Sequence, residues 1–184
     1  MRTLTTERLI LRPWQDRDRA PLAAILGDPV VRRFYPAIAT PAETSAQIDA
    51  AIEKTANNGF HFAAAELRAS GELAGLIGIG VIPDFLREVI PGRPRVEIGW
   101  QLKTSVWGQG LAPEGAHAWL EYAFAELGLD EIVAFTANLN LPSQRVMQKL
   151  GMHRNPDDDF DHPNLPVGHR LRRHVLYRIA SPAR

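Results

Sequence analysis

The stretch Trp107-Gly108-Gln109-Gly110-Leu111-Ala112 follows a strand-like run that ends at Leu102 and precedes a helix-like run from Pro113 to Leu127. Because glycine adopts backbone angles that other residues avoid, the two glycines allow a tight turn at this point. A strand, a glycine-rich turn and a helix N-terminus together present several backbone N–H groups to one anion. The stretch therefore predicts a phosphate-binding turn in a protein that combines strands and helices.

The composition limits the class of protein. The chain has 184 residues, 45% of them apolar, which suits one domain with a buried core. Basic and acidic residues number 21 each, so the formal net charge is zero and a general nucleic-acid binder is disfavoured. The absence of cysteine excludes disulfides, cysteine-ligated metals and an acyl-cysteine intermediate. We see no signal-peptide core and no apolar run near the roughly 20 residues that span a bilayer, so we expect a cytoplasmic protein with no membrane partner.

Hydrophobic periodicity and the glycine and proline positions predict the order β-α-α-β-β-β-α-β-α-β-β, a mixed sheet with helices on its faces. The predicted strands are 7–12, 60–67, 73–82, 95–102, 131–136, a strand from Met152, and 171–179. The predicted helices are 16–26, 41–57, 113–127 and 142–150, and the segments 83–95 and 155–168 are predicted loops.

Local signals support several of these elements. Asp16 is a predicted helix cap, and Thr40-Pro41-Ala42-Glu43 has the pattern of a capping box with proline at the first helical position. We expect the helix after it to bury Ile48 and Ile52. The glycines of the 73–82 strand do not have the spacing of a dinucleotide-binding motif, so they predict close backbone packing within the strand.

Four short motifs, taken together, carry a resemblance to a known family. They are Glu97-Ile98-Gly99-Trp100, Trp107-Gly108-Gln109-Gly110, Asn140-Leu141-Pro142-Ser143 and Lys149-Leu150-Gly151-Met152. In this order and on these elements they resemble the GNAT superfamily of acetyl-CoA-dependent N-acetyltransferases, above all its ribosomal-protein-alanine acetyltransferase branch. The resemblance covers nearly the whole chain and implies a single domain, 1–184. It implies an α+β fold whose central, mostly antiparallel sheet is splayed at strands 4 and 5 and flanked by about four helices.

The resemblance implies acetyl-CoA as cosubstrate and no metal. The loop from Val106 to Ala112 would bind the pyrophosphate through backbone N–H groups, helped by the dipole of the following helix. The strand end from Trp100 to Lys103 would offer N–H groups to the pantetheine and to the thioester oxygen. Asn140 would reach the pantetheine or the thioester, although a plain helix cap explains it as well. The implied cofactor-binding residues are Trp100, Gln101, Leu102, Lys103, Val106, Trp107, Gly108, Gln109, Gly110, Leu111, Ala112, Asn138, Asn140 and Ser143.

Two residues are candidates for moving protons. Glu97 lies on an otherwise apolar strand near the split, where it would take the proton of the acceptor amine or only orient that amine. Many members of the superfamily have a tyrosine as general acid where this chain has Met147, so the role of protonating the leaving thiolate shifts to Ser143. Without a cysteine, direct transfer in a ternary complex is the expected mechanism.

The remaining expectations concern the acceptor and the partners. Phe34, Tyr35 and His174 are candidate acceptor contacts. The acceptor would be a primary amine, either a protein N-terminus or a small amine, and the superfamily leaves room for a homodimer. Two alternatives stay open: a non-catalytic module that binds acyl-CoA or another phosphorylated ligand, which the missing tyrosine favours, and a nucleotide-dependent transferase.

Overall fold

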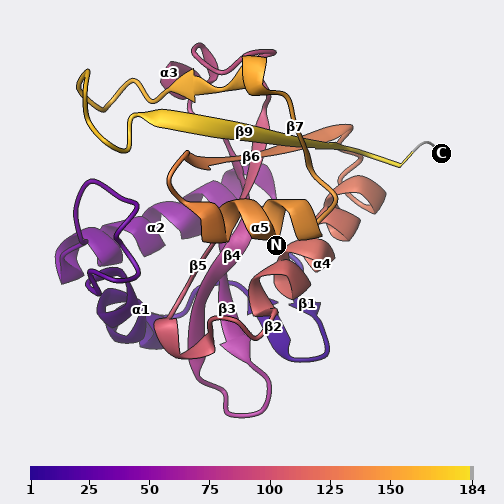
Figure 1. Cartoon of the computed structure of the whole chain (residues 1–184). Helices are drawn as coiled ribbons and strands as arrows, with labels where there is room; N and C mark the ends of the chain where they lie inside the picture. The colour runs from indigo at the N-terminus through magenta and orange to yellow at the C-terminus, as the bar shows by residue number, and fades with distance from the viewer. Residues whose placement is uncertain (183–184) are drawn as a thin grey trace. The chain divides into compact units, whose positions relative to one another are not determined.

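The computed structural model describes residues 1–182 (Figure 1). These residues form two compact units. Unit 1 comprises Met1–Ile79 and Gly99–Trp119. Unit 2 comprises Gly80–Ile98 and the described residues from Leu120 onward. Two strands, β4 (Leu73–Val81) and β5 (Val96–Leu102), and one helix, α4 (Leu111–Ala125), each run from one unit into the other. The hydrogen-bonded strand order is β1-β2-β3-β4-β5-β6-β9-β7, with β8 paired to β9.

Unit 1 contains an antiparallel run of strands. Strand β1 (Leu4–Thr5) pairs with β2 (Leu9–Arg12), β2 pairs with β3 (Ala63–Leu67), and β3 pairs with β4. The β3–β4 pair shifts register between Ala65 and Glu66. The short strand β1 was not predicted, so the predicted fourth and fifth strands correspond to β5 and β6.

Helices α1 (Arg19–Leu26) and α2 (Pro41–Asn58) of unit 1 lie side by side (Figure 1). The predicted capping box is confirmed, because Thr40 Oγ1 accepts from Glu43 N while Glu43 Oε2 accepts from Thr40 N. The prediction for Ile52 is wrong, since its side chain is 45% exposed. The buried positions of this helix are 44, 48 and 51, so the apolar stripe turns away from position 52.

The start of α1 also differs from the prediction. A 3-10 turn, η1 (Asp16–Asp18), precedes the helix, and the N-cap position of α1 is Asp18 rather than Asp16. Asp16 is exposed and forms an ion pair with Arg19, whereas Asp18 is buried against Arg12. Asp18 is therefore held by the ion pair with Arg12 and by the hydrogen bond from Gln15 N, the N-cap residue of η1.

The predicted close packing of the β4 glycines is confirmed. A Cβ atom on Gly75 would lie 2.1 Å from the main-chain oxygen of Gln101, and one on Gly78 would lie 2.5 Å from the Cα of Phe62. Neither neighbour can withdraw, because each is backbone. These glycines allow β4 to pack against the neighbouring main-chain segments more closely than any side chain would permit.

Unit 2 is built around β6 (Glu131–Ala137) and β9 (Arg173–Ala180), which pair antiparallel over their whole length. Strand β6 also pairs in parallel with β5 at Glu97↔Val133. Strands β7 (His153–Arg154) and β8 (Phe160–Asp161) add to β9. The mixed, mostly antiparallel sheet is thus confirmed.

Helix α5 (Leu141–Lys149) of unit 2 matches its predicted range within one residue at each end. The predicted loop 83–95 contains one helical turn, α3 (Asp84–Arg87), so the described residues have five α-helices where about four were expected. The predicted loop 155–168 contains a 3-10 turn, η3 (Pro156–Asp158), and the strand β8. Both elements are short and support buried apolar residues: Leu86 and Ile90 near the first, Phe160 in the second.

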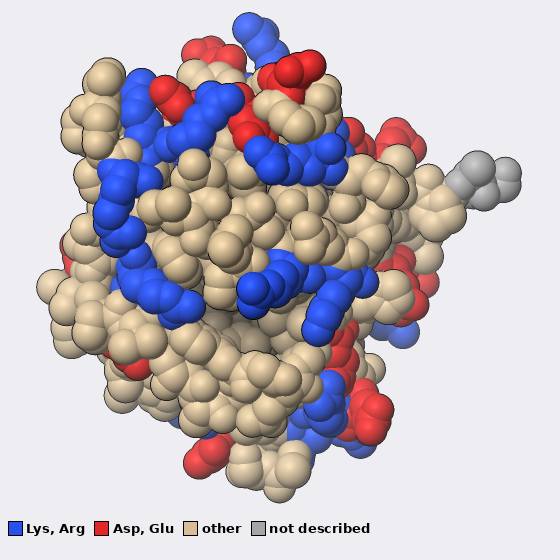
Figure 2. Space-filling model, in the orientation of Figure 1, with Lys and Arg blue, Asp and Glu red and all other residues tan. Residues whose placement is uncertain are grey.

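The surface carries charges of both signs. Figure 2 shows basic and acidic side chains on the same face, in line with the zero net charge. In the part of the chain that the structure describes, no helix has the length and apolar character to cross a membrane. Because the net charge is zero, positive charge for an anionic ligand must come from particular residues rather than from the overall charge of the protein.

Candidate functional site

The predicted phosphate-binding turn has an open backbone. Gly108 and Gly110 have φ angles of 75° and 80°, which favour glycine, and α4 begins directly after them at Leu111. A Cβ atom on Gly108 would meet nothing within 4 Å. Within residues 1–182, no main-chain N–H from Gly108 to Ala112 donates to a protein acceptor, and the first helical bond runs from Glu114 N to Gly110 O. This run of unengaged donors at a helix N-terminus is suited to an anion with several oxygen atoms.

An ion pair between Arg8 and Glu114, which we call the latch, supports the turn. Arg8 Nη1 donates to Gln109 O at 2.8 Å, and Arg8 Nε donates to Glu114 Oε2 at 2.6 Å. Glu114 also accepts from Thr6 Oγ1 at 2.5 Å and from Arg8 N at 2.8 Å. Burial alone would raise the pKa of Glu114, but the hydrogen bonds from Thr6 and Arg8 outweigh it, so this pKa is lowered. The sequence analysis missed Arg8, although a carboxylate in the first turn of a helix that is predicted to bind an anion indicates a basic partner.

Trp107 joins the turn to the end of β5 and to the loop after α1. Its indole Nε1 donates to Leu102 O at 2.8 Å, and its side chain remains 39% exposed. The guanidinium carbon of Arg33 lies 4.7 Å from the centroid of the Trp107 ring. The side chain of Trp107 is thus fixed on one edge by the strand and covered on one face by an arginine.

The polar groups of the β5 end are partly engaged within unit 1. Lys103 N donates to Ala74 O at 2.8 Å, and Lys103 Nζ forms an ion pair with Glu72 at 3.1 Å. Gln101 is buried, and its Nε2 atom has no hydrogen-bond partner among the described residues. A buried amide without a partner is costly, so Gln101 marks a place where a ligand acceptor would be favourable.

The loop after α1 carries the predicted acceptor contacts Phe34 and Tyr35. Arg33 lies over the Phe34 ring at 4.7 Å, and Arg32 lies over the Tyr35 ring at 3.8 Å. Because Arg33 also covers Trp107, Phe34 belongs to the same cluster as Trp107, the residue directly before Gly108. The structure thus brings part of the predicted acceptor wall and the predicted phosphate turn together within unit 1.

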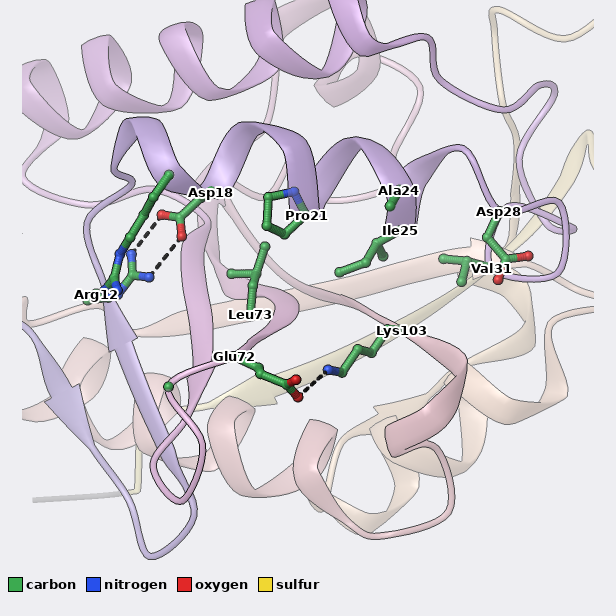
Figure 3. A pocket seen from close by; sticks show the side chains of 12 residues that line it. Arg12, Asp18, Pro21, Ala24, Ile25, Asp28, Val31, Glu72, Leu73 and Lys103 are labelled. Carbon is green, nitrogen blue, oxygen red and sulfur yellow. Dashed lines mark hydrogen bonds and ion pairs between the residues drawn. The ribbon is translucent and has the colours of Figure 1, made fainter.

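A separate groove of about 460 Å³ runs along α1 (Figure 3). The Arg12–Asp18 pair lies at one end of it and the Glu72–Lys103 pair on the opposite wall. Arg17, which also lines the groove, contacts Glu66 at 3.0 Å. Since each of these cations faces a carboxylate, the groove offers paired charges over an apolar floor, unlike the open turn.

The junction of β6 and α5 in unit 2 carries three of the predicted site residues: Asn138, Asn140 and Ser143. Asn140 is the N-cap of α5, with Oδ1 accepting from Ser143 N at 3.3 Å and Nδ2 donating to Thr136 Oγ1 at 2.9 Å. Asn138 O accepts from Gln144 Nε2 at 2.9 Å. The capping role of Asn140 is thus observed, and its amide hydrogen bonds fix the direction in which α5 starts.

Ser143 and Met147 lie on the same helix in different surroundings. Met147 is 1% exposed and belongs to the core, so it fills the position of the expected tyrosine as a packing residue. Ser143 lies half-buried in the first turn of α5. Glu97 is half-buried on β5, and it is the partner of Val133 in the parallel pairing of β5 with β6.

His174 lies at the start of β9 in an aromatic cluster of unit 2. Its ring centroid is 5.6 Å from that of Phe160 and 5.0 Å from that of His162, and its Nδ1 is 3.1 Å from Arg172 O. Burial lowers the pKa of His174 to about 4 and also lowers the pKa of His162. Both imidazoles are therefore neutral near pH 7, and His174 would offer hydrogen bonds or ring contact rather than charge.

Comparisons with known proteins identify the family and the fold of this chain. The family model for the acetyltransferase (GNAT) domain matches residues 8–153. A Bacillus subtilis protein named uncharacterized N-acetyltransferase YnaD is 30% identical over 176 residues, which cover 96% of this chain and 95% of YnaD. A crystal structure of a GNAT-family acetyltransferase from Bacillus anthracis has a TM-score of 0.76 and 25% identity, covering 98% of this chain and 99% of that one.

A protein that bears the name of the predicted branch shares the fold of this chain. Ribosomal-protein-S5-alanine acetyltransferase from Vibrio fischeri has a TM-score of 0.74 at 15% identity, covering 98% of this chain and 97% of that chain. An identity this low shows a shared fold and nothing about the acceptor. The match of the family model over most of the chain, on the elements that build the open turn, is the deciding result: the chain belongs to the GNAT acetyltransferase family.

Proposed function

We propose that this protein is a single-domain N-acetyltransferase, residues 1–184, that transfers the acetyl group of acetyl-CoA directly to a primary amine in a ternary complex. The observation that carries the proposal is the run of unengaged N–H groups from Gly108 to Ala112 at the start of α4. Five consecutive residues with this property fit a diphosphate, which has oxygen atoms along a comparable length of chain. Family membership supports the acetyl transfer.

Acetyl-CoA would supply an activated thioester, and the residues of this chain would bind and orient it. Gly108 and Gly110 allow the main chain to approach the pyrophosphate, and the α4 N-terminus adds about half a unit of positive charge. The β5 end, Trp100 to Lys103, would hold the pantetheine arm, with the unpartnered Gln101 Nε2 as an additional donor. Val106 is buried and anchors the entrance to the turn through the short 3-10 turn η2 (Thr104–Val106).

Proton transfer would use two residues of unit 2. Glu97 would accept a proton from the ammonium form of the acceptor, which leaves a lone pair to form the new C–N bond. As the C–S bond breaks, the Ser143 hydroxyl would give a proton to the leaving thiolate. The nitrogen, which carries an extra proton once the C–N bond has formed, would lose it through water to the Ser143 oxygen, so that the products are the amide, the free thiol and the proton held by Glu97. Met147 has no proton to donate and is buried in the core, which leaves this role to another group.

The acceptor would be a protein N-terminus or a small amine. Phe34 and Tyr35 of unit 1 and His174 of unit 2 are the proposed acceptor contacts. A cytoplasmic location follows from the same proposal, because that compartment supplies acetyl-CoA.

The test is an acetyl-transfer screen with acetyl-CoA and a panel of small amines and N-terminal peptides, read by release of free thiol. We expect thiol release with at least one class of amine, and a loss of at least about tenfold in kcat for Glu97→Gln. Glu53→Gln, at an exposed position on α2, is the matched control and should keep full activity. Binding of CoA without acetylation of any amine would indicate a binding module, and protection of the fold by ATP but not by CoA would indicate a nucleotide-dependent transferase.

A further inference from the structure

The segment between α2 and β3 carries two neighbouring aromatic side chains. His61 and Phe62 lie in the stretch 60–62, which precedes β3 and belongs to no helix or strand. Their ring centroids are 5.1 Å apart, and their ring planes meet at 68°. We call this pair the ring corner. Both side chains are half-buried, so part of the corner packs against the interior of unit 1 and part of it is accessible from outside.

Two neighbours fix the main chain of the ring corner. A Cβ atom on Gly78 of β4 would lie 2.5 Å from Phe62 Cα and 3.0 Å from His61 O, so the segment packs directly on the main chain of β4. On another side, Trp14 Nε1 donates to Phe62 O at 2.8 Å, and the Trp14 side chain is buried. Side chains that extend from a fixed main chain lose little conformational entropy when they bind a ligand.

The ring of Phe62 lies against β5 where the proposed thioester site begins. A Cβ atom on Gly99 would be 3.1 Å from Phe62 Cε1 and 3.5 Å from Phe62 Cζ. The ring edge therefore occupies the space beside the strand that a side chain at position 99 would fill. Gly99 directly precedes Trp100, the first residue of the strand end that would hold the pantetheine and the thioester. An amine that rests on Phe62 would thus lie beside the acetyl group.

His61 has a polar atom without a partner. Its Nδ1 is enclosed and has no hydrogen-bond partner among residues 1–182. Burial, followed by the charge of Lys54, lowers the pKa of His61 to about 4, so the imidazole is neutral near pH 7. A proton on the enclosed nitrogen would have no acceptor, which favours the tautomer with the proton on Nε2 and a lone pair on Nδ1. The neutral ring can therefore accept a hydrogen bond, and it does not repel an ammonium group.

The unpartnered nitrogen favours a ligand that brings an N–H donor. An enclosed acceptor without a partner costs free energy, and a hydrogen bond to it removes that cost. Because the ring is half-buried, a half-turn about its Cβ–Cγ bond keeps its outline and moves Nδ1 to the opposite edge. Phe62 adds the negative face of an aromatic ring, which attracts an ammonium group. A hydrogen-bond acceptor beside an apolar ring suits a primary amine with an apolar substituent.

We propose that the ring corner binds the amino group of the acceptor, with His61 Nδ1 accepting a hydrogen bond from it and the Phe62 ring contacting the apolar carbon chain attached to it. The inference rests on the proposed function and deepens it, since it assigns a positioning residue and a substrate class, primary amines with an apolar substituent. The hydrogen bond to His61 would aim the nitrogen at the thioester carbon. His61 would not take the proton itself, because a group with so low a pKa is a weak base.

The test compares two ligands that differ in their N–H donors. Dissociation constants are measured by NMR titration at pH 7 for 2-phenylethylamine and for its trimethylammonium counterpart, which keeps the charge and has no N–H group. For His61→Leu we expect the Kd of 2-phenylethylamine to rise about fivefold, as for one lost hydrogen bond, and the Kd of the trimethylammonium ligand to change by less than about twofold. His61→Asn restores an acceptor oxygen near the position of Nδ1, so its Kd values should stay within about twofold of the wild-type values.

Stability separates binding from a structural role. An apolar group in place of an unpartnered enclosed nitrogen relieves its cost, so His61→Leu should keep or raise the midpoint of thermal unfolding and leave the Kd of acetyl-CoA unchanged. Lys54→Gln is the matched control. Lys54 is exposed on α2 and acts on His61 through its charge, so its loss should not raise the Kd of 2-phenylethylamine.

Several results would overturn the proposal. They are no binding of 2-phenylethylamine to the wild-type protein, an unchanged Kd in His61→Leu, equal losses in His61→Leu and His61→Asn, and an equal loss for the trimethylammonium ligand. A lower unfolding midpoint in His61→Leu together with weaker binding of acetyl-CoA would show a structural role instead. The acetyl-transfer screen decides the proposed function separately: without thiol release for any amine the enzymatic function fails, while the titrations still decide whether the ring corner binds amines.

Discussion

Two regions of unit 1 use the same residue types for opposite purposes. On β4, Gly75 and Gly78 bring main chain against main chain, and a Cβ atom there would lie 2.1 Å and 2.5 Å from backbone atoms. In the turn before α4, Gly108 faces open space, and the nearest atom to a Cβ on Gly110 is the tip of Arg8 at 3.5 Å. On β4, the missing side chain lets two main-chain segments pack closely. In the turn, it leaves the main-chain N–H groups accessible.

The arginine–carboxylate ion pairs of unit 1 also differ in exposure between the packed interior and the glycine turn. Arg12 forms ion pairs with Asp18 at 2.7 Å and with Glu66 at 2.8 Å, and the three side chains are almost fully buried. Arg8 pairs with Glu114 beside the turn, where 46% of the arginine side chain is exposed. The packed region therefore depends on the exclusion of water, whereas the turn depends on an arrangement that leaves donors accessible.

Gly75→Ala should have the largest effect. Its Cβ would overlap Gln101 O, and the φ angle of 144° is unfavourable for alanine, so we expect a loss of about 4 kcal/mol or more in the free energy of unfolding. Denaturant titration at neutral pH measures this loss. Gly71→Ala in the adjacent turn is the control, because it has open space and only the cost of a positive φ, about 1 kcal/mol. Similar losses for the two variants would remove the evidence for tight packing on β4.

Asp18→Asn should have the second largest effect, about 3 kcal/mol, because it leaves the buried Arg12 without one of its carboxylates. Burial raises the pKa of Asp18, but hydrogen bonds from Arg12 and from Gln15 N outweigh it, and the pKa is lowered. The stability that this carboxylate contributes is therefore complete above its ordinary pKa of about 4 and is lost as the pH falls through the lower folded value. Unfolding measured from pH 7 to pH 3 should show a steeper decline for the wild-type protein than for Asp18→Asn. Parallel curves would contradict the prediction.

The sequence predicts the features that depend on neighbours along the chain. The capping box of α2 joins residues three apart, and the glycine turn, its strand and its helix form one continuous stretch. Family resemblance identified the fold from the same local motifs. Short elements such as α3 and β8 were not predicted, because they contain too few residues for a periodic pattern. Tertiary packing of Leu86 and Phe160 stabilises them.

The partners of the turn could not be predicted from local patterns. Arg8 reaches Gln109 across 101 positions of sequence, and Arg33 reaches Trp107 from the loop after α1. The same limit explains the error at Asp16, because only the fold shows that Asp18 faces Arg12 and that Glu66 lies on the other side. A single sequence indicates which residues could supply a charge, and the fold decides which of them does.

Gly108→Ala and Gly110→Ala should weaken binding as well as folding. Each forces a side chain into a positive φ, which costs about 1–2 kcal/mol, and each adds a Cβ where the cofactor phosphate would approach. We expect the Kd of acetyl-CoA to rise at least about tenfold, as measured by calorimetry. Gly59→Ala, at the C-cap of α2, has the same type of φ and the same open surroundings, so it should lose similar stability and no affinity. An unchanged Kd in both turn variants would remove the turn from the binding site.

Glu114→Gln should have the smallest effect on stability, about 1 kcal/mol, even though Glu114 accepts as many hydrogen bonds as Asp18 does. Water reaches the exposed Arg8 partner and screens the pair, and the amide of glutamine can still accept from Thr6 or Arg8. Salt distinguishes the two ion pairs: the cost of Glu114→Gln should shrink between 0.05 M and about 1 M NaCl, whereas the cost of Asp18→Asn should change little, because ions do not enter the buried site. Denaturant titrations at both salt concentrations measure this difference. If Glu114→Gln costs as much as Asp18→Asn at both concentrations, the latch behind the turn is part of the core, and the open character of the turn must come from its glycines alone.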